Sequence, residues 1–138
     1  MTGRQGRVLI VEDEVLLAWM MRETLEEAGH GVVALASDHR EAVDAALAHR
    51  PDLVLMDIRL ARGTSGIAAA VEIFERTGIR SIFVTATGDA EKRRRAEPAR
   101  PLAWLGKPYD PDDLLALLQA ALADLPSADR AVAAAVHG

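Results

Sequence analysis

The sequence contains no cysteine, which excludes disulfide bonds and thiolate metal sites. It also lacks any apolar run near the roughly 18 residues that a membrane-spanning helix needs. Residues 1–6 have no apolar segment of the kind found in signal peptides. We therefore expect a soluble, cytoplasmic protein that does not contact a membrane.

Two other residue types are scarce. Of the 16 basic residues only Lys92 and Lys107 are lysines, so a lysine at a particular place is informative. Four histidines are present and none shows the spacing of a metal ligand set; we interpret all four as surface or loop residues (His30, His39, His49 and His137).

The overall charge and composition fit one globular domain. The 138-residue chain carries a net charge of −5, which argues against nucleic-acid binding. Half of its residues are hydrophobic and 27% are charged, which excludes a disordered chain. We expect a folded domain over residues 7–125, a disordered N-terminus over 1–6, and an alanine-rich tail over 126–138.

Short apolar runs alternate with helical patterns five times. The expected strands are 7–11, 31–36, 53–56, 81–84 and 102–106, and the expected helices are 15–28, about 39–49, 67–77, 90–97 and 111–124. Apolar strands that alternate with helices predict a parallel sheet with helices on both faces. In the first helix, helical spacing predicts an inward stripe of Leu17, Met20, Met21, Thr24 and Ala28.

Polar residues stand where several of these strands end. Glu12 and Asp13 follow the first strand, Asp57 the third, Thr85 the fourth and Lys107 the fifth. A parallel sheet places the carboxyl ends of its strands along one edge, so these side chains should lie together. Hard oxygen donors suit Mg²⁺ or Mn²⁺, and a lysine suits a phosphoryl oxygen. A carboxylate can itself attack phosphorus and form an acyl phosphate, and Asp57 is the natural nucleophile.

Four motifs carry a family resemblance. They are Val11–Glu12–Asp13–Glu14, Leu55–Met56–Asp57, Val84–Thr85–Ala86 and Lys107–Pro108. Their order and spacing are similar to those of response-regulator receiver domains, over nearly the whole chain from about Arg7 to Leu125. The resemblance implies an α/β, flavodoxin-like, doubly wound sheet of five parallel strands in the order 2-1-3-4-5.

The resemblance also implies a metal site. Asp57 would be the phosphoacceptor, Asp13 a direct Mg²⁺ ligand, and Glu12 a ligand acting through water. Asp57 and the backbone carbonyl of Arg59 would complete the protein ligands. The phosphoryl donor in such systems is a phosphohistidine on a sensor histidine kinase or a histidine phosphotransfer protein.

Other roles concern response to the phosphoryl group. Thr85 and Lys107 match the pair that contacts the phosphate, and Trp104 falls where the family usually has an aromatic switch residue. In this family the positions that match Arg59 and Thr87 flank the path of hydrolytic water, so the resemblance implies that these two residues set the lifetime of the acyl phosphate. The loop after Asp57 is one residue longer than the commonest pattern and lacks the usual proline.

Leu16 and Trp19 lie off the predicted inward stripe of the first helix. A large aromatic residue in that position is often covered by a neighbouring segment. It is also suited to a docking surface beside the site, where a partner's helices would present the phosphohistidine.

Three other functions make different demands on these residues. A haloacid-type phosphohydrolase also uses a strand-end aspartate, but needs a second aspartate two residues later, where this chain has Arg59. A flavin or nucleotide site would need an anion cradle after the first strand, where acidic residues stand instead. An interaction module without phosphorylation is a third reading.

The residues after the last predicted helix are too few for a DNA-binding domain, so we expect no effector domain in this chain. We therefore expect output through a partner protein, a phosphorelay or a phosphate sink, with no enzymatic activity beyond the chain's own phosphorylation and dephosphorylation. We expect a monomer or weak homodimer.

Overall fold

The computed structural model describes residues 5–126, which form one parallel sheet of five strands in the order β2-β1-β3-β4-β5. The strands are β1 (Arg7–Val11), β2 (Gly31–Ala36), β3 (Leu53–Met56), β4 (Ser81–Thr85) and β5 (Ala103–Gly106). The helices are α1 (Val15–Glu27), α2 (His39–His49), α3 (Gly66–Thr77), α4 (Ala90–Ala96) and α5 (Pro111–Asp124). The predicted fold class and strand order are confirmed.

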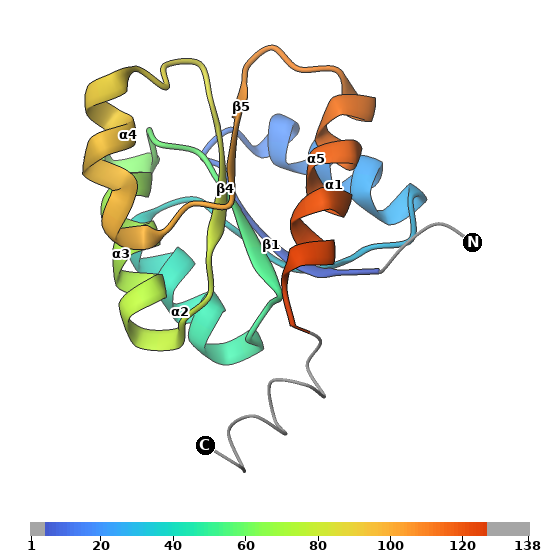
Figure 1. Ribbon diagram of the computed structural model, residues 1–138, viewed down its shortest axis with the longest axis horizontal. Coiled ribbons are helices and arrows are strands. Elements are labelled where there is room, and N and C mark those ends of the chain that lie inside the picture. Colours follow the sequence, from blue (N-terminus) through green and yellow to red (C-terminus); the bar gives the residue numbers. More distant parts are fainter. Residues whose placement is uncertain (1–4, 127–138) are drawn as a thin grey trace.

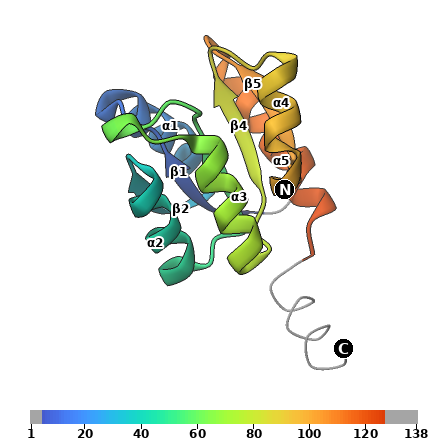
Figure 2. The ribbon, with the colours of Figure 1, turned by 90° about the vertical axis from the view of Figure 1, so that its left-hand side faces the viewer.

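Helices cover both faces of the sheet. Helices α1 and α5 lie on one face of the sheet and α2, α3 and α4 on the other (Figure 1). In Figure 2, where the left-hand side of Figure 1 faces the viewer, α3 lies in front of the sheet. Every residue of β3 and β4 is buried, because each of these strands has a helix layer on both sides. No helix within residues 5–126 is long and apolar enough to cross a bilayer.

Local sequence explains where the helices begin. Side chains of Asp38, Ser65, Asp89 and Asp110 accept hydrogen bonds from backbone N–H groups in the first turns of α2, α3, α4 and α5. Helix α4 has only seven residues and passes directly into a 3₁₀ turn, Glu97–Ala99, which contains Pro98. The predicted bounds of β3 and α5 are those found.

The predicted inward face of α1 is wrong at two of its five residues, Met20 and Ala28, whereas Met21 is buried and Leu17 and Thr24 are half-buried. The buried residues are Ala18, Met21 and Leu25, whereas Met20 is 56% exposed and Ala28 is also exposed. Residues 15–21 are all apolar, so hydrophobic spacing alone does not select one stripe of this helix. The burial leaves four large apolar side chains of the first two turns in solvent: Val15, Leu16, Trp19 and Met20.

The histidines differ from the prediction in two places. His30 is buried, and its Nδ1 accepts a hydrogen bond from the backbone N–H of Gly6 (3.0 Å). His39 is half-buried, with its Nε2 2.8 Å from Glu72 Oε1. Gly6 is itself buried, just before the predicted start of the domain. Residues 1–4 and 127–138, where we predicted most of a disordered N-terminus and an alanine-rich tail, lie outside the described residues.

Candidate functional site

The carboxyl edge of the sheet brings together the polar residues that follow its strands. Backbone hydrogen bonds continue past the strand ends: Glu12 N–H donates to Ala36, Asp57 N–H to Val11, and Lys107 N–H to Thr85. These bonds hold Glu12, Asp57 and Lys107 in register with the neighbouring strands. Residues far apart in the sequence are thereby fixed at adjacent positions.

Lys107 joins two of the carboxylates. Its ammonium Nζ donates to Glu12 Oε1 at 2.5 Å and to Asp57 Oδ2 at 2.7 Å. The Glu12 side chain is 2% exposed, that of Asp57 12% and that of Lys107 19%. Charges so little exposed are tolerated only when paired, so the lysine stabilises a pair of carboxylates that would otherwise repel each other.

Burial controls the protonation of this group. It raises the pKa of Glu12 to about 7, and the negative charge of Asp57 also raises it, while the hydrogen bond from Lys107 acts in the opposite direction. Burial alone would lower the pKa of Lys107, but its hydrogen bonds to Asp57 and Glu12 outweigh that effect and raise it. Lys107 is therefore charged at neutral pH, and a further cation would favour the ionised form of Glu12.

Three carboxylates lie close enough to hold one metal ion. Oxygen atoms of Glu12, Asp13 and Asp57 all lie within 4.8 Å of one another. Two of the three side chains, Asp13 and Asp57, line a cavity of about 290 Å³ together with Glu14, Leu17, Arg59, Thr85, Ala86, Thr87 and Lys107. The donor set consists of hard oxygen atoms, which fits Mg²⁺ and does not fit a soft metal.

Arg59 and Asp57 belong to a closely held loop. One carboxylate oxygen of Asp57, Oδ1, accepts a hydrogen bond from the N–H of Ile58 at 2.6 Å, so the side chain is anchored at its base. Arg59 is exposed at the mouth of the cavity, and its backbone forms an isolated antiparallel bridge with Ser65.

Thr85 and Thr87 also line this cavity. Thr85 is 5% exposed, and its Oγ1 accepts a hydrogen bond from Thr87 N–H at 3.3 Å. Thr87 is exposed in the loop between β4 and α4. A hydroxyl at the end of β4 and an ammonium after β5 thus face the same cavity as Asp57.

Trp104 lies behind this loop, on the α4 side of the sheet. Its ring stacks on Phe83 with centroids 4.5 Å apart, and the guanidinium of Arg93 lies 4.9 Å from the ring centroid. Gly88 packs so closely that a Cβ there would lie 3.3 Å from the indole. Movement of the β4–α4 loop would therefore change the surroundings of Trp104.

An apolar surface borders the site on its other side. Leu16 is 68% exposed and Trp19 54% exposed on α1. Beside them lies a groove of about 570 Å³ lined mainly by apolar side chains and reaching Glu12 and Lys107; its other lining residues are Leu17, Met20, Met21, Thr24, Ala86, Pro108, Tyr109 and Pro111. The predicted docking residues are thus not covered by any segment among residues 5–126.

Gly66 was missed by sequence reasoning. Its N–H donates to the carbonyl of Ile58 at 2.7 Å, and a Cβ built on it would lie 1.7 Å from the carbonyl oxygen of Asp57. The ion pair of Asp38 with Arg62, which joins the start of α2 to the loop after Asp57, was not predicted either. The one available signal for Gly66 was a glycine at the end of the predicted loop, directly before the predicted helix that starts at Ile67.

Known proteins resemble this chain over most of its length. A family model described as "Response regulator receiver domain" matches residues 8–119. Curated relatives include the transcriptional regulatory protein PdtaR of Mycobacterium tuberculosis, 39% identical over 84% of this chain and 56% of its own length. The phyllosphere-induced regulator PhyR of Methylorubrum extorquens is 36% identical over 89% of this chain and 46% of its own. The chain thus spans about half the length of these relatives.

Solved structures agree with the sequence matches. The signal receiver domain of a modulated diguanylate cyclase from Desulfovibrio desulfuricans superposes with a TM-score of 0.79 at 33% identity, covering 87% of this chain and 95% of that one. A two-component response regulator of the LuxR family from Aurantimonas gives a TM-score of 0.81 at 30% identity, covering 93% and 94%.

Proposed function

Because the chain belongs to the response-regulator receiver family of two-component signalling proteins, we propose that Asp57 accepts a phosphoryl group from a phosphohistidine. The donor is a sensor histidine kinase or a histidine phosphotransfer protein. The observation that carries the proposal is the bonding of Lys107 to Asp57 and Glu12, at a cavity also lined by Asp13 and Thr85.

The transfer follows from the positions of these groups. The free oxygen lone pairs of Asp57 attack phosphorus, the bond from phosphorus to the imidazole nitrogen breaks, and the released imidazole takes a proton from water. Glu12, Asp13, Asp57 and the carbonyl of Arg59 would hold Mg²⁺, which screens the repulsion between the carboxylate and the incoming phosphoryl oxygens. Lys107 and the hydroxyl of Thr85 then donate to the oxygens of the acyl phosphate.

The direct test is covalent labelling of the purified chain. Incubation with Mg²⁺ and acetyl phosphate should add one phosphoryl group, measured by intact mass. Asp57→Asn should abolish the addition, and Asp44→Asn, an exposed aspartate on α2, should not change it. Continuous release of phosphate without an adduct would support the phosphohydrolase reading, and neither adduct nor release would support a module that signals without phosphorylation.

Trp104 is proposed to report the phosphorylated state. Capture of the phosphoryl group by Thr85 would draw the β4–α4 loop toward the site and shift the balance between two positions of α4, and Trp104 would repack. In a Trp19→Phe background the remaining tryptophan fluorescence should change on phosphorylation. Fluorescence that is the same with and without the phosphoryl group would refute the switch role.

The acyl-phosphate lifetime is proposed to depend on Arg59 and Thr87. Both lie at the cavity wall, where a bulky cationic side chain changes access of water to the acyl phosphate. Arg59→Ala should alter the dephosphorylation rate of the labelled protein. An unchanged rate would remove Arg59 from this role.

The exposed apolar end of α1 is proposed to dock the phosphoryl donor. Leu16 and Trp19 are exposed on α1, and the residues that follow them, Leu17 and Met20, line the groove that reaches Lys107. A helix bound across this end of α1 would therefore lie close to Asp57. Trp19→Ala should slow transfer from the cognate kinase while leaving labelling by acetyl phosphate unchanged. Equal transfer rates for both proteins would contradict docking by this surface.

The phosphorylated chain is proposed to signal by binding a partner protein. Two other outcomes of the same phosphorylation are transfer of the phosphoryl group along a phosphorelay and action as a phosphate sink for the kinase. A profile of phosphotransfer against candidate kinases, with Asp57→Asn as the control, identifies the donor. Loss of the label to a second phosphotransfer protein would indicate a relay, and binding of a target only to the phosphorylated form would indicate a switch.

A further inference from the structure

The loop after Asp57 contains a backbone conformation that needs support. Arg62 has φ 59° and ψ 31°, in the left-handed region, and Gly63 follows with φ 68°. This conformation is strained for a residue with a side chain, because the Cβ lies close to the following carbonyl oxygen, whereas glycine adopts it freely. Arg50 and Arg100 share it at helix ends, so the case for Arg62 rests on the contacts of its side chain.

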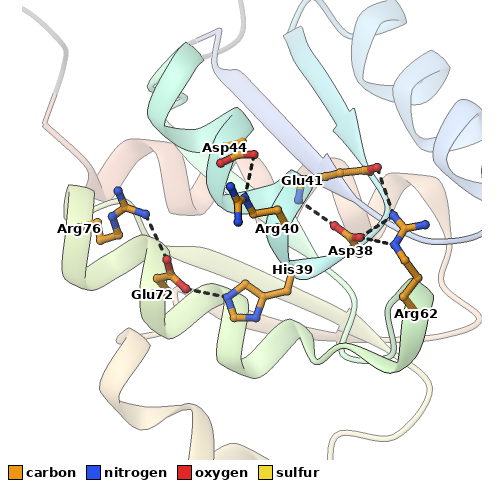
Figure 3. A network of polar contacts seen from close by, with 8 residues as sticks. All are labelled: Asp38, His39, Arg40, Glu41, Asp44, Arg62, Glu72 and Arg76. Atoms are coloured by element: carbon orange, nitrogen blue, oxygen red, sulfur yellow. Dashed lines mark hydrogen bonds and ion pairs between the residues drawn. The ribbon is translucent and has the colours of Figure 1, made fainter.

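That side chain is held by the start of α2. Arg62 Nε donates to Asp38 Oδ2 at 2.6 Å, and its Nη2 donates to Glu41 Oε2 at 3.3 Å (Figure 3). The other oxygen of Asp38, Oδ1, accepts from Glu41 N–H at 2.7 Å and caps the helix. Because the cap fixes the carboxylate, Asp38 is a rigid anchor, and its side chain is only 9% exposed.

Two further hydrogen bonds tie the same two segments together, one between backbone groups and one to the Thr64 hydroxyl. Ala61 N–H donates to the carbonyl of Ser37 at 2.8 Å, and His39 N–H donates to Thr64 Oγ1 at 3.1 Å. The apex of the loop is therefore attached to the segment between β2 and α2, which lies outside the site itself.

The base of the loop is closed on itself. Leu60 N–H donates to the carbonyl of Thr64, Arg59 bridges Ser65, and Gly66 N–H donates to the carbonyl of Ile58. A displacement of the apex is passed through these short cross-links to Arg59. That residue lies at the cavity with Asp57.

We propose that the Asp38–Arg62 ion pair is a positioning device that sets the loop at the metal-binding cavity through its attachment to α2. The proposal rests on the phosphoacceptor function proposed above. Neither residue touches the cavity, so both are positioning residues and not catalytic ones. An exposed ion pair would contribute little, but this one has a nearly buried acceptor and a second carboxylate, Glu41.

Two variants remove the ion pair. Arg62→Gly deletes the guanidinium but also relieves the left-handed strain, so the lost pair and the relieved strain oppose each other and the free energy of unfolding should change little. Asp38→Asn keeps an oxygen for the helix cap but places an amide NH₂ against the guanidinium. Arg40→Ala and Asp44→Asn are matched controls, because this exposed pair lies on α2 and does not contact the loop.

The wild type, the two variants and the controls are compared by their Mg²⁺ dissociation constants and by the hydrogen-exchange rates of their backbone amides. Loss of an orienting partner typically weakens metal binding 10- to 100-fold. Because the hydrogen bonds of Ala61 to Ser37 and of His39 to Thr64 remain, we expect Arg62→Gly and Asp38→Asn to raise the Mg²⁺ dissociation constant about 10-fold. The amides of Leu60 and Ala61 should exchange faster, both controls should behave as wild type, and Arg62→Lys should be intermediate.

The outcomes separate the two proposals. Unchanged Mg²⁺ affinity in both variants, with normal binding by the wild type, would overturn the positioning role alone, even if loop exchange were faster. A wild-type chain that binds no Mg²⁺ would refute the phosphoacceptor function and the positioning role with it. Weaker Mg²⁺ binding in variants of unchanged stability supports the positioning role, since a purely structural role would not separate these two quantities.

Discussion

Gly66 gives the sharpest test of how the fold holds the candidate nucleophile. A Cβ at this position would lie 1.7 Å from the carbonyl oxygen of Asp57 and 2.7 Å from its carbonyl carbon. Ordinary contact begins near 3.4 Å, so Gly66→Ala requires a shift of about 1.7 Å in backbone atoms. The neighbour is main chain and not the end of a flexible side chain, so α3 or the Asp57 segment must move.

The expected loss of stability is the sum of two costs, partly offset by one gain. Overpacking in a close contact costs about 1–3 kcal/mol, and the hydrogen bond from Gly66 to Ile58 is worth about 1 kcal/mol. The better helix propensity of alanine returns up to about 1 kcal/mol. We therefore expect Gly66→Ala to lower the free energy of unfolding by about 2–3 kcal/mol, leaving a domain of this size folded.

Urea unfolding measures this loss as a shift of the midpoint by roughly 1 M, with an unchanged slope. Gly106→Ala is the matched control, because a Cβ there meets nothing within 4 Å and the backbone is not left-handed. It should change the free energy of unfolding by less than about 0.5 kcal/mol. Equal stabilities of Gly66→Ala and Gly106→Ala would refute the steric reasoning.

Three further predictions concern protonation and an unpaired hydroxyl. Mg²⁺ affinity should weaken as the pH falls through about 7, because a proton then competes for the buried Glu12, and Glu12→Gln should remove this dependence in titrations at several pH values. Burial lowers the pKa of His30, so its contribution to stability should be complete above pH 6.5 and be lost as the pH falls below that value. Urea unfolding at several pH values measures this loss, which His30→Asn should abolish, since an amide oxygen can still accept from Gly6. Ser81→Ala should leave the free energy of unfolding unchanged or raise it by about 1 kcal/mol, because the buried Ser81 Oγ has no hydrogen-bond partner among residues 5–126; a clear loss in thermal melts would contradict this.

The sheet and its carboxyl edge could be predicted from the sequence because each strand is a short apolar run ending at a polar residue. Topology then decides which of those residues meet, and Glu12, Asp57 and Lys107 are found bonded to one another. The strand order itself came from the resemblance to receiver domains. Once that order is known a parallel sheet allows few alternatives, so this part of the site was accessible without coordinates.

The inward face of α1 and the burial of His30 could not be predicted in the same way. Seven consecutive apolar residues at the start of α1 leave the choice of face to packing against the sheet. Burial of His30 is tolerated because its Nδ1 accepts a hydrogen bond from the N–H of Gly6, a partner that the sequence pattern does not reveal. The Asp38–Arg62 pair was equally hidden, since the two residues are 24 positions apart and neither belongs to a hydrophobic pattern.

The contacts of Lys107 also make the charge balance of the site depend on pairing of the edge strand β5. Lys107 lies 95 positions from Glu12 and 50 from Asp57, and it reaches them only when β5 has joined the sheet beside β4. A chain still emerging from the ribosome, or one whose edge strand has detached, has its acidic residues in place without their counter-charge. The charges of the pocket are thus balanced only when β5 is paired with β4.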